Sequence, residues 1–117
     1  MVALIDDDRS VLRALKDLME AAGVSAQSFG SAEEFLEAHH RSPIACLVAD
    51  IRLPGMSGLE LQALLKAEGS PVPIIFITAH SDGHVRMQAM TAGAVECLSK
   101  PFDDDVLLET VRAALTA

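Results

Sequence analysis

The sequence has 117 residues, and its 17 acidic and 9 basic side chains give a net charge of −8 with histidine neutral. This acidic balance excludes the usual binder of nucleic-acid phosphates, whose affinity depends on clustered Lys and Arg. Half of the residues are hydrophobic, which excludes a disordered chain, and no apolar run approaches the roughly 20 residues that cross a bilayer.

The first quarter of the chain predicts a strand, a helix and a second strand. The apolar run Val2–Ile5 is the first strand, and leucines at helical spacing over Arg9–Ala22 predict a helix that ends at Gly23. The run Val24–Phe29 is more polar than the other predicted strands, so we place it at an edge of the sheet.

The middle of the chain predicts a second helix, a third strand and a third helix. Ser31 and Glu34 have the spacing of a capping box and predict the start of a helix. The apolar run Ile44–Ala49 predicts a buried strand. Four leucines at positions 59, 61, 64 and 65 predict a helix that ends near Gly69.

The last part of the chain repeats the alternation twice. The runs Pro73–Ile77 and Val95–Ser99 predict strands that are covered on both faces. Between them a helix is predicted to start near residues 82–84 and to end at Gly93, and a final helix is predicted from about Asp103 onward.

Five strands that alternate with five helices predict an α/β fold of (βα)5 type. Such chains form a doubly wound parallel sheet with right-handed crossovers and helices on both faces. The five pairs fill the sequence, so we expect one domain over residues 1–117. Two cysteines are too few for a disulfide scaffold, which favours a reducing, cytoplasmic location.

Charged and hydroxyl side chains follow the predicted strands. Asp6 and Asp7 follow the first strand, Asp50 the third, Thr78 the fourth and Lys100 the fifth. Because ligands of open parallel sheets bind at the carboxyl ends of the strands, we expect these side chains to converge. Clustered carboxylates that repel one another suit an oxygen-ligated cation such as Mg²⁺, with Mn²⁺ as the alternative. For any single aspartate, a helix cap or a solvated charge remains the simpler explanation, and Asp8 is well placed to cap the first helix.

In this order and at these strand ends, the five residues resemble the CheY-like receiver domain of two-component response regulators. The stretches Ile51–Gly58 and Lys100–Phe102 support the resemblance, which covers the whole chain. It implies a flavodoxin-like sheet with strand order 2-1-3-4-5. The stretches Ser31–Leu36 and Leu47–Leu61 look most like receivers attached to LuxR-type helix-turn-helix domains.

The resemblance implies a phosphoacceptor and a metal site. Asp50 would accept a phosphoryl group from a histidine kinase. Asp7, Asp50 and the main-chain carbonyl of Arg52 would ligate Mg²⁺, and Asp6 would act through a coordinated water. Such a domain is not an ordinary enzyme, although it catalyses its own phosphoryl transfer and slow autodephosphorylation.

The resemblance also implies residues that respond to the phosphoryl group. Lys100, after a Lys-Pro bond that is typically cis, would pair with Asp50 and then with the phosphoryl group, and Thr78 would donate a hydrogen bond to it. Cys97 stands where receivers usually carry an aromatic ring, and we expect a small, partly exposed residue there. Arg52 and His80 would shield the aspartyl phosphate from water.

The implied partners are a histidine kinase and an output domain or downstream protein, the output domain being a DNA-binding one. We expect no membrane contact and no nucleic-acid binding by this domain. Phosphorylation would change the face formed by the fourth helix, fifth strand and fifth helix, and Met87, Met90 and Leu108 are candidate contacts for a homodimer there.

Three other functions can be compared with these residues. A haloacid-dehalogenase-type phosphohydrolase needs an aspartate where Arg52 stands, and a nucleotide or flavin binder needs a glycine-rich phosphate loop after the first strand. The alternative that stays open is a receiver-fold interaction module with impaired phosphorylation switching, which Cys97 favours and the acidic pocket disfavours.

Overall fold

The computed structural model describes the chain except for residues 39–42, 80–82 and 117. Its elements are β1 (Val2–Ile5), α1 (Arg9–Ala21), β2 (Ala26–Phe29), α2 (Ala32–Ala38), β3 (Cys46–Asp50), α3 (Gly58–Ala67), β4 (Ile74–Thr78), α4 (Gly83–Thr91), β5 (Glu96–Ser99) and α5 (Asp104–Thr116). Within the described ranges, none of the helices is both long and apolar enough to span a membrane.

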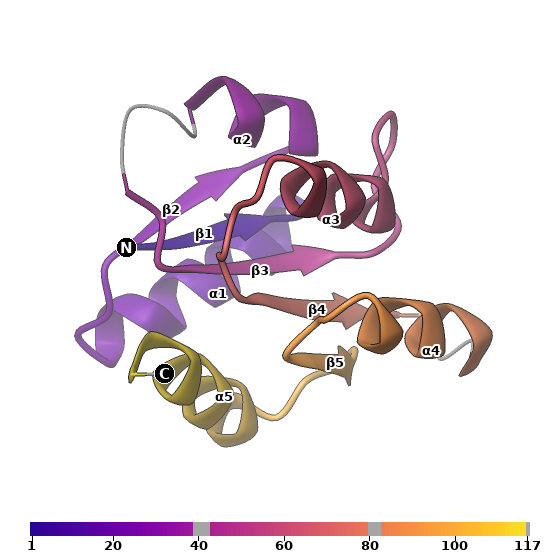
Figure 1. Cartoon of the computed structure of the whole chain (residues 1–117). Helices are drawn as coiled ribbons and strands as arrows, with labels where there is room; N and C mark the ends of the chain where they lie inside the picture. Colours follow the sequence, from indigo (N-terminus) through magenta and orange to yellow (C-terminus); the bar gives the residue numbers. More distant parts are fainter. Residues whose placement is uncertain (39–42, 80–82, 117) are drawn as a thin grey trace.

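The five strands form one parallel sheet in the order β2-β1-β3-β4-β5 (Figure 1). The predicted fold class and the edge position of the second strand are confirmed. The prediction that the fifth strand is covered on both faces holds only in part, since Cys97 is buried in one hydrophobic layer and Leu98 packs, partly buried, against the other. β5 forms the other edge of the sheet, and Cys97 is its one buried residue.

Two hydrophobic layers enclose the sheet. Side chains alternate along β1, so Ala3 and Ile5 join the layer of α2, α3 and α4, whereas Val2 and Leu4 join the layer of α1 and α5. Figure 1 shows α2 and α3 together on one side of the sheet and α1 and α5 on the other. This double cover is why β1, β3 and β4 are apolar at nearly every position.

Side chains cap the helices that follow β2 and β3. At α2, Ser31 accepts a hydrogen bond from the main-chain N–H of Glu34, but the Glu34 carboxylate reaches back to the N–H of Gly30, one residue earlier than in the predicted capping box. A complete capping box occurs instead at α3, between Ser57 and Glu60. It fixes the point at which the loop after β3 turns into a helix.

Candidate functional site

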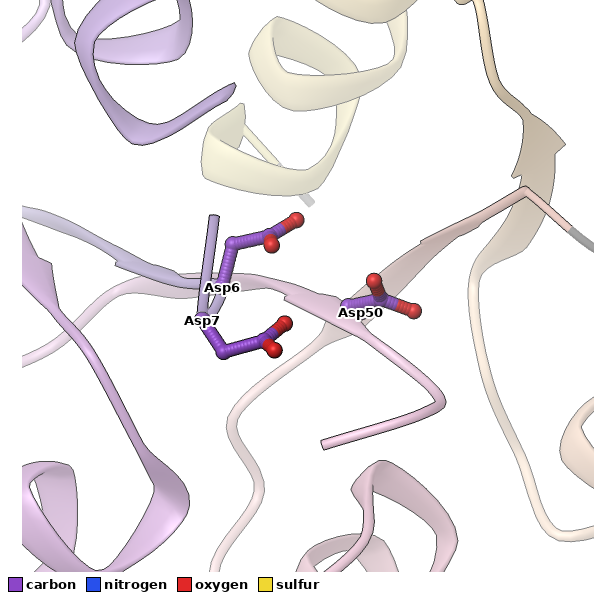
Figure 2. Close-up of side chains that lie close together, drawn as sticks. All are labelled: Asp6, Asp7 and Asp50. Atoms are coloured by element: carbon purple, nitrogen blue, oxygen red, sulfur yellow. The ribbon is translucent and has the colours of Figure 1, made fainter. Parts of the chain in front are cut away.

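Three carboxylates meet at the carboxyl ends of β1 and β3. Asp6 follows Ile5, whose neighbour in the register of β3 is Ala49, so Asp6 and Asp50 lie at the same point of adjacent strands. Carboxylate oxygens of Asp6, Asp7 and Asp50 lie within 4.8 Å of one another. Figure 2 shows the three side chains extending toward the same side. The predicted convergence of these aspartates is confirmed.

The main chain holds two of these carboxylates in place. Asp6 is fully buried, and its Oδ1 accepts a hydrogen bond of 2.9 Å from the N–H of Asp8. Asp50 is 6% exposed, and its Oδ1 accepts one of 3.0 Å from the N–H of Arg52. Asp7 is exposed. The predicted role of Asp8 as a cap is confirmed, since its carboxylate accepts hydrogen bonds from the first turn of α1. The cluster is therefore ordered on two sides and open to solvent at Asp7.

Lys100 reaches the cluster from the edge strand β5. Its Nζ lies 2.8 Å from Oδ2 of Asp6 and 2.8 Å from Oδ2 of Asp50, and its side chain is 17% exposed. The Lys100–Pro101 peptide bond is cis, as expected. The main-chain N–H of Lys100 donates to the carbonyl of Thr78 at 2.8 Å. Lys100 thus joins the carboxylates of β1 and β3 to the end of β4.

Burial and pairing act in opposite directions on the charges of this site. Burial raises the pKa of Asp6, and its hydrogen bonds to Lys100 and to the N–H of Asp8 offset only part of that rise. Burial alone would lower the pKa of Lys100, but hydrogen bonds and charge attraction from Asp50 and Asp6 outweigh it and raise that pKa. The shift of Asp6 thus reflects its burial, and the shift of Lys100 reflects the negative charge around it.

The donor set fits a hard divalent cation. Three carboxylates face one ammonium group, so the site retains excess negative charge when all four groups are ionised. Carboxylate oxygens are preferred ligands of Mg²⁺ and Mn²⁺, and the exposed side at Asp7 leaves room for the coordinated waters that Mg²⁺ keeps. Asp6, Asp7 and Asp50 could therefore hold such an ion.

The structure brings Thr78 to the same edge of the sheet. Asp50 pairs with Ile77 in the register of β3 and β4, and Thr78 is the next residue and is buried. Cys97 is also buried, with 1% of its surface exposed, in the layer under α4. The expectation of a partly exposed residue there is wrong, because Cys97 belongs to the same hydrophobic cluster as Ala89 of α4.

The two predicted shielding residues have different outcomes. Arg52 is exposed beside the site, and its main-chain N–H contacts Asp50. His80 lies outside the described residues. The shielding role assigned to this pair stays a prediction.

Two residues near the site had no role in the sequence-based prediction. A Cβ at Gly58 would lie 2.6 Å from the main-chain oxygen of Asp50 and 2.8 Å from Cα of Ile51, so only glycine lets α3 approach the end of β3. Glu33 accepts a hydrogen bond from the main chain of Met56, in the loop after β3. The residues Pro54–Gly58 indicate a turn after β3, but nothing in the local sequence indicates that this loop contacts Glu33.

Comparison with known proteins adds the family. The model of the family described as "Response regulator receiver domain" matches residues 2–112. Response regulator protein TodT of Pseudomonas putida is 44% identical over 98% of this chain and 51% of its own length. Transcriptional regulatory protein FixJ of Bradyrhizobium diazoefficiens is 39% identical over 97% of this chain and 56% of its own. The solved structure of the response regulator StyR is 46% identical with a TM-score of 0.88, covering 98% of this chain and 58% of that one. The chain thus spans about half the length of the curated relatives it matches.

Proposed function

The chain belongs to the family of response regulator receiver domains, and we propose that Asp50 is its phosphoacceptor. A histidine kinase would supply the phosphoryl group as a phosphohistidine. The observation that carries the proposal is Lys100, whose ammonium group contacts Asp6 and Asp50 at once above a cluster of three carboxylates. Neither a solvated surface lysine nor an aspartate that only caps a helix accounts for this contact with two carboxylates.

The transfer forms one bond and breaks another. A carboxylate oxygen of Asp50 forms the bond to phosphorus while the bond from phosphorus to the kinase imidazole nitrogen breaks, and the electron pair remains on that nitrogen. Positioning and charge neutralisation supply most of the catalysis in such transfers. The N–H of Arg52 orients the attacking carboxylate, and Lys100 exchanges its contact with Asp50 for one with a phosphoryl oxygen.

Asp7, Asp50 and the main-chain carbonyl of Arg52 would hold Mg²⁺, or Mn²⁺, with Asp6 acting through a coordinated water. When bound, the ion neutralises charge on the phosphoryl oxygens. The same pocket would support slow autodephosphorylation, and we propose that the bulk of Arg52 and His80 hinders attack by water. Unchanged dephosphorylation of an Arg52→Ala, His80→Ala double variant would exclude that role.

The response passes from the pocket to the β4–β5 edge. A phosphoryl group adds charge and three acceptor oxygens, to which the Thr78 hydroxyl would donate a hydrogen bond. The face made by α4, β5 and α5 would then change shape. Met87 and Met90 are exposed on α4 and would become contacts of a phosphorylation-dependent homodimer, whereas Leu108 is only partly exposed. Cys97 has a smaller volume than an aromatic ring, so the switch would rely on Thr78.

The relatives support a regulatory partner outside this chain. FixJ is named a transcriptional regulatory protein, and the chain covers only 56% of it. We propose that this domain controls a DNA-binding output domain or a downstream protein in the cytoplasm, and that with a charge of −8 it does not itself bind nucleic acid.

Intact-protein mass spectrometry tests the proposal. The chain is incubated with Mg²⁺ and acetyl phosphate, and we expect the mass to increase by one phosphoryl group. The adduct should be absent in Asp50→Asn and after chelation of Mg²⁺, but present in the matched surface variant Asp17→Asn. If no donor produces an Asp50-dependent adduct, the chain is a passive interaction module and the proposal is wrong.

A further inference from the structure

A glutamate of α2 holds the loop that follows the phosphoacceptor strand. Oε2 of Glu33 accepts a hydrogen bond of 3.0 Å from the main-chain N–H of Met56, across 23 residues of sequence. Glu33 is exposed and does not belong to the cluster of Asp6, Asp7 and Asp50. Its influence on the site must therefore pass through the loop.

The loop is shaped to fit this carboxylate. Gly55 has a φ of +72°, a conformation that side chains disfavour, and a Cβ built there would lie 2.5 Å from Oε2 of Glu33. The chain therefore passes directly over the carboxylate before it presents the N–H of Met56 to it. A side chain at Gly55 would displace Glu33 or the loop.

Hydrogen bonds hold the segment from residue 51 to residue 58 at its base, at its far part and at the start of α3, where the N–H of Ser57 donates to Glu60. The N–H of Arg52 donates to Asp50 at the start, and the N–H of Gly58 donates to the carbonyl of Ile51 at 2.8 Å, which closes the base. The hydrogen bond from Met56 to Glu33 connects the far part of the loop to α2. Without it, the loop keeps the two bonds at its base and the cap at Ser57, and within the described part of the chain no other hydrogen bond fixes the main chain between Arg52 and Ser57.

We propose that Glu33 is a positioning residue for divalent-cation binding. Its carboxylate fixes the loop after β3 and thereby the main chain of Arg52, whose carbonyl completes the ligand set of Asp7 and Asp50. This inference rests on the proposed function of the site. It predicts that an exposed acidic residue outside the ligand cluster controls the affinity for Mg²⁺.

Titration of the ¹⁵N-labelled chain with Mg²⁺, followed by NMR without a phosphoryl donor, tests the inference. Glu33→Ala should raise the Mg²⁺ dissociation constant about threefold to tenfold, the range expected for one lost hydrogen bond. Glu33→Gln keeps a carbonyl acceptor in the same place and should recover most of the affinity. Glu37→Ala removes the same charge from an exposed position of α2 and should bind Mg²⁺ as the unmodified chain does.

Two outcomes would overturn the inference. Unchanged Mg²⁺ affinity in Glu33→Ala excludes a positioning role, and equal weakening in Glu33→Ala, Glu33→Gln and Glu37→Ala would mean that distant charge alone acts. A second readout is hydrogen exchange of the Met56 amide, which should accelerate in Glu33→Ala. Gly55→Ala perturbs the same contact from the other side and should also weaken binding. Formation of the Asp50 adduct by the unmodified chain is scored separately, so failure of the proposed function remains distinguishable.

Discussion

Replacing Lys100 with methionine tests the electrostatic account of the site most directly. Methionine keeps much of the side-chain volume and removes the ammonium group that contacts Asp6 and Asp50. The variant leaves two carboxylates without their cation, one of them fully buried. We therefore expect Lys100→Met to lower the free energy of unfolding when divalent cations are absent.

The size of the effect follows from distance and exposure. At 2.8 Å and an effective dielectric constant of about 20, each attraction amounts to ~6 kcal/mol before desolvation of the ammonium opposes it. Removing one partner of a fully buried pair typically costs about 3–5 kcal/mol. Because the Lys100 side chain is 17% exposed, we expect a loss of about 2–3 kcal/mol near neutral pH.

The loss should depend on pH in both directions. Pairing raises the pKa of Lys100 above its ordinary value of 10.5, so its stabilising contribution is present below pH 10.5 and disappears as pH rises through the folded-state pKa. On the acid side, burial raises the pKa of Asp6 above 3.8, so the folded state binds this proton more tightly than the unfolded state does. Without Lys100 that pKa rises further, and acid should progressively restore stability to the variant relative to the parent.

Urea unfolding followed by circular dichroism between pH 4 and pH 11, with a chelator present, measures this difference. The control is Lys66→Met on α3, an exposed lysine that forms no ion pair within the described parts of the chain. In an Asp6→Asn background, the cost of Lys100→Met should shrink by more than 1 kcal/mol, because one buried carboxylate is gone. Equal stability of Lys100→Met and Lys66→Met at neutral pH would refute the reasoning.

Three further changes test packing and burial away from the ion pair. Gly58→Ala should lower the free energy of unfolding in urea by about 1–3 kcal/mol, because the new Cβ meets main-chain atoms of Asp50 and Ile51. Gly83→Ala, where a Cβ meets nothing, should instead raise it by about 0.5–1 kcal/mol through the first turn of α4. Equal effects of the two variants would contradict the packing argument. Gln62→Ala removes a buried hydrogen bond of 3.0 Å from α3 to a carbonyl of α4 and should lower the free energy of unfolding by about 1–2 kcal/mol. Amide hydrogen exchange in α4 should become faster. Unchanged exchange would show that the bond does not hold the helix. Burial raises the pKa of Cys46 to about 11 and also raises that of Cys97, so neither thiol should react with Ellman's reagent at pH 8 until urea unfolds the chain, and fast native labelling would contradict their burial.

The fold and the centre of the site were predictable because their signals are local. Short runs of largely apolar residues indicate the strands, and parallel strands present their carboxyl ends at one edge of the sheet. Asp6, Asp7 and Asp50 could therefore be brought together without coordinates, and the structure places them within 4.8 Å of one another. The first strand has the predicted bounds, and the bounds of the other strands differ from the predicted ones by at most two residues, as at β2, which begins at Ala26.

The features that escaped prediction depend on contacts between distant segments. The bond from Met56 to Glu33 joins the loop after β3 to helix α2 of another βα unit, and the local sequence of neither segment indicates its partner. The burial of Cys97 depends on how α4 covers an edge strand, which the pattern of a single strand does not contain. The Ser57–Glu60 capping box is a local feature whose spacing is present in the sequence, and it was not predicted.

The position of Lys100 explains how a charge change in the interior of the sheet can reach its edge. Asp6 directly follows β1 and Asp50 ends β3, two strands with neighbours on both sides, so these buried carboxylates have little freedom to move. Lys100 directly follows the edge strand β5, and its main-chain N–H donates to Thr78 while its Nζ contacts both carboxylates. Any redistribution of charge at Asp50 must therefore alter the contacts of a residue attached to β4 and β5. This edge is held by few buried side chains, because Cys97 is the one buried residue of β5 and Ala89 is the one buried residue of α4 among the described positions. A rigid centre and a loosely held edge are what a domain needs if it is to convert a local chemical change into a change of surface.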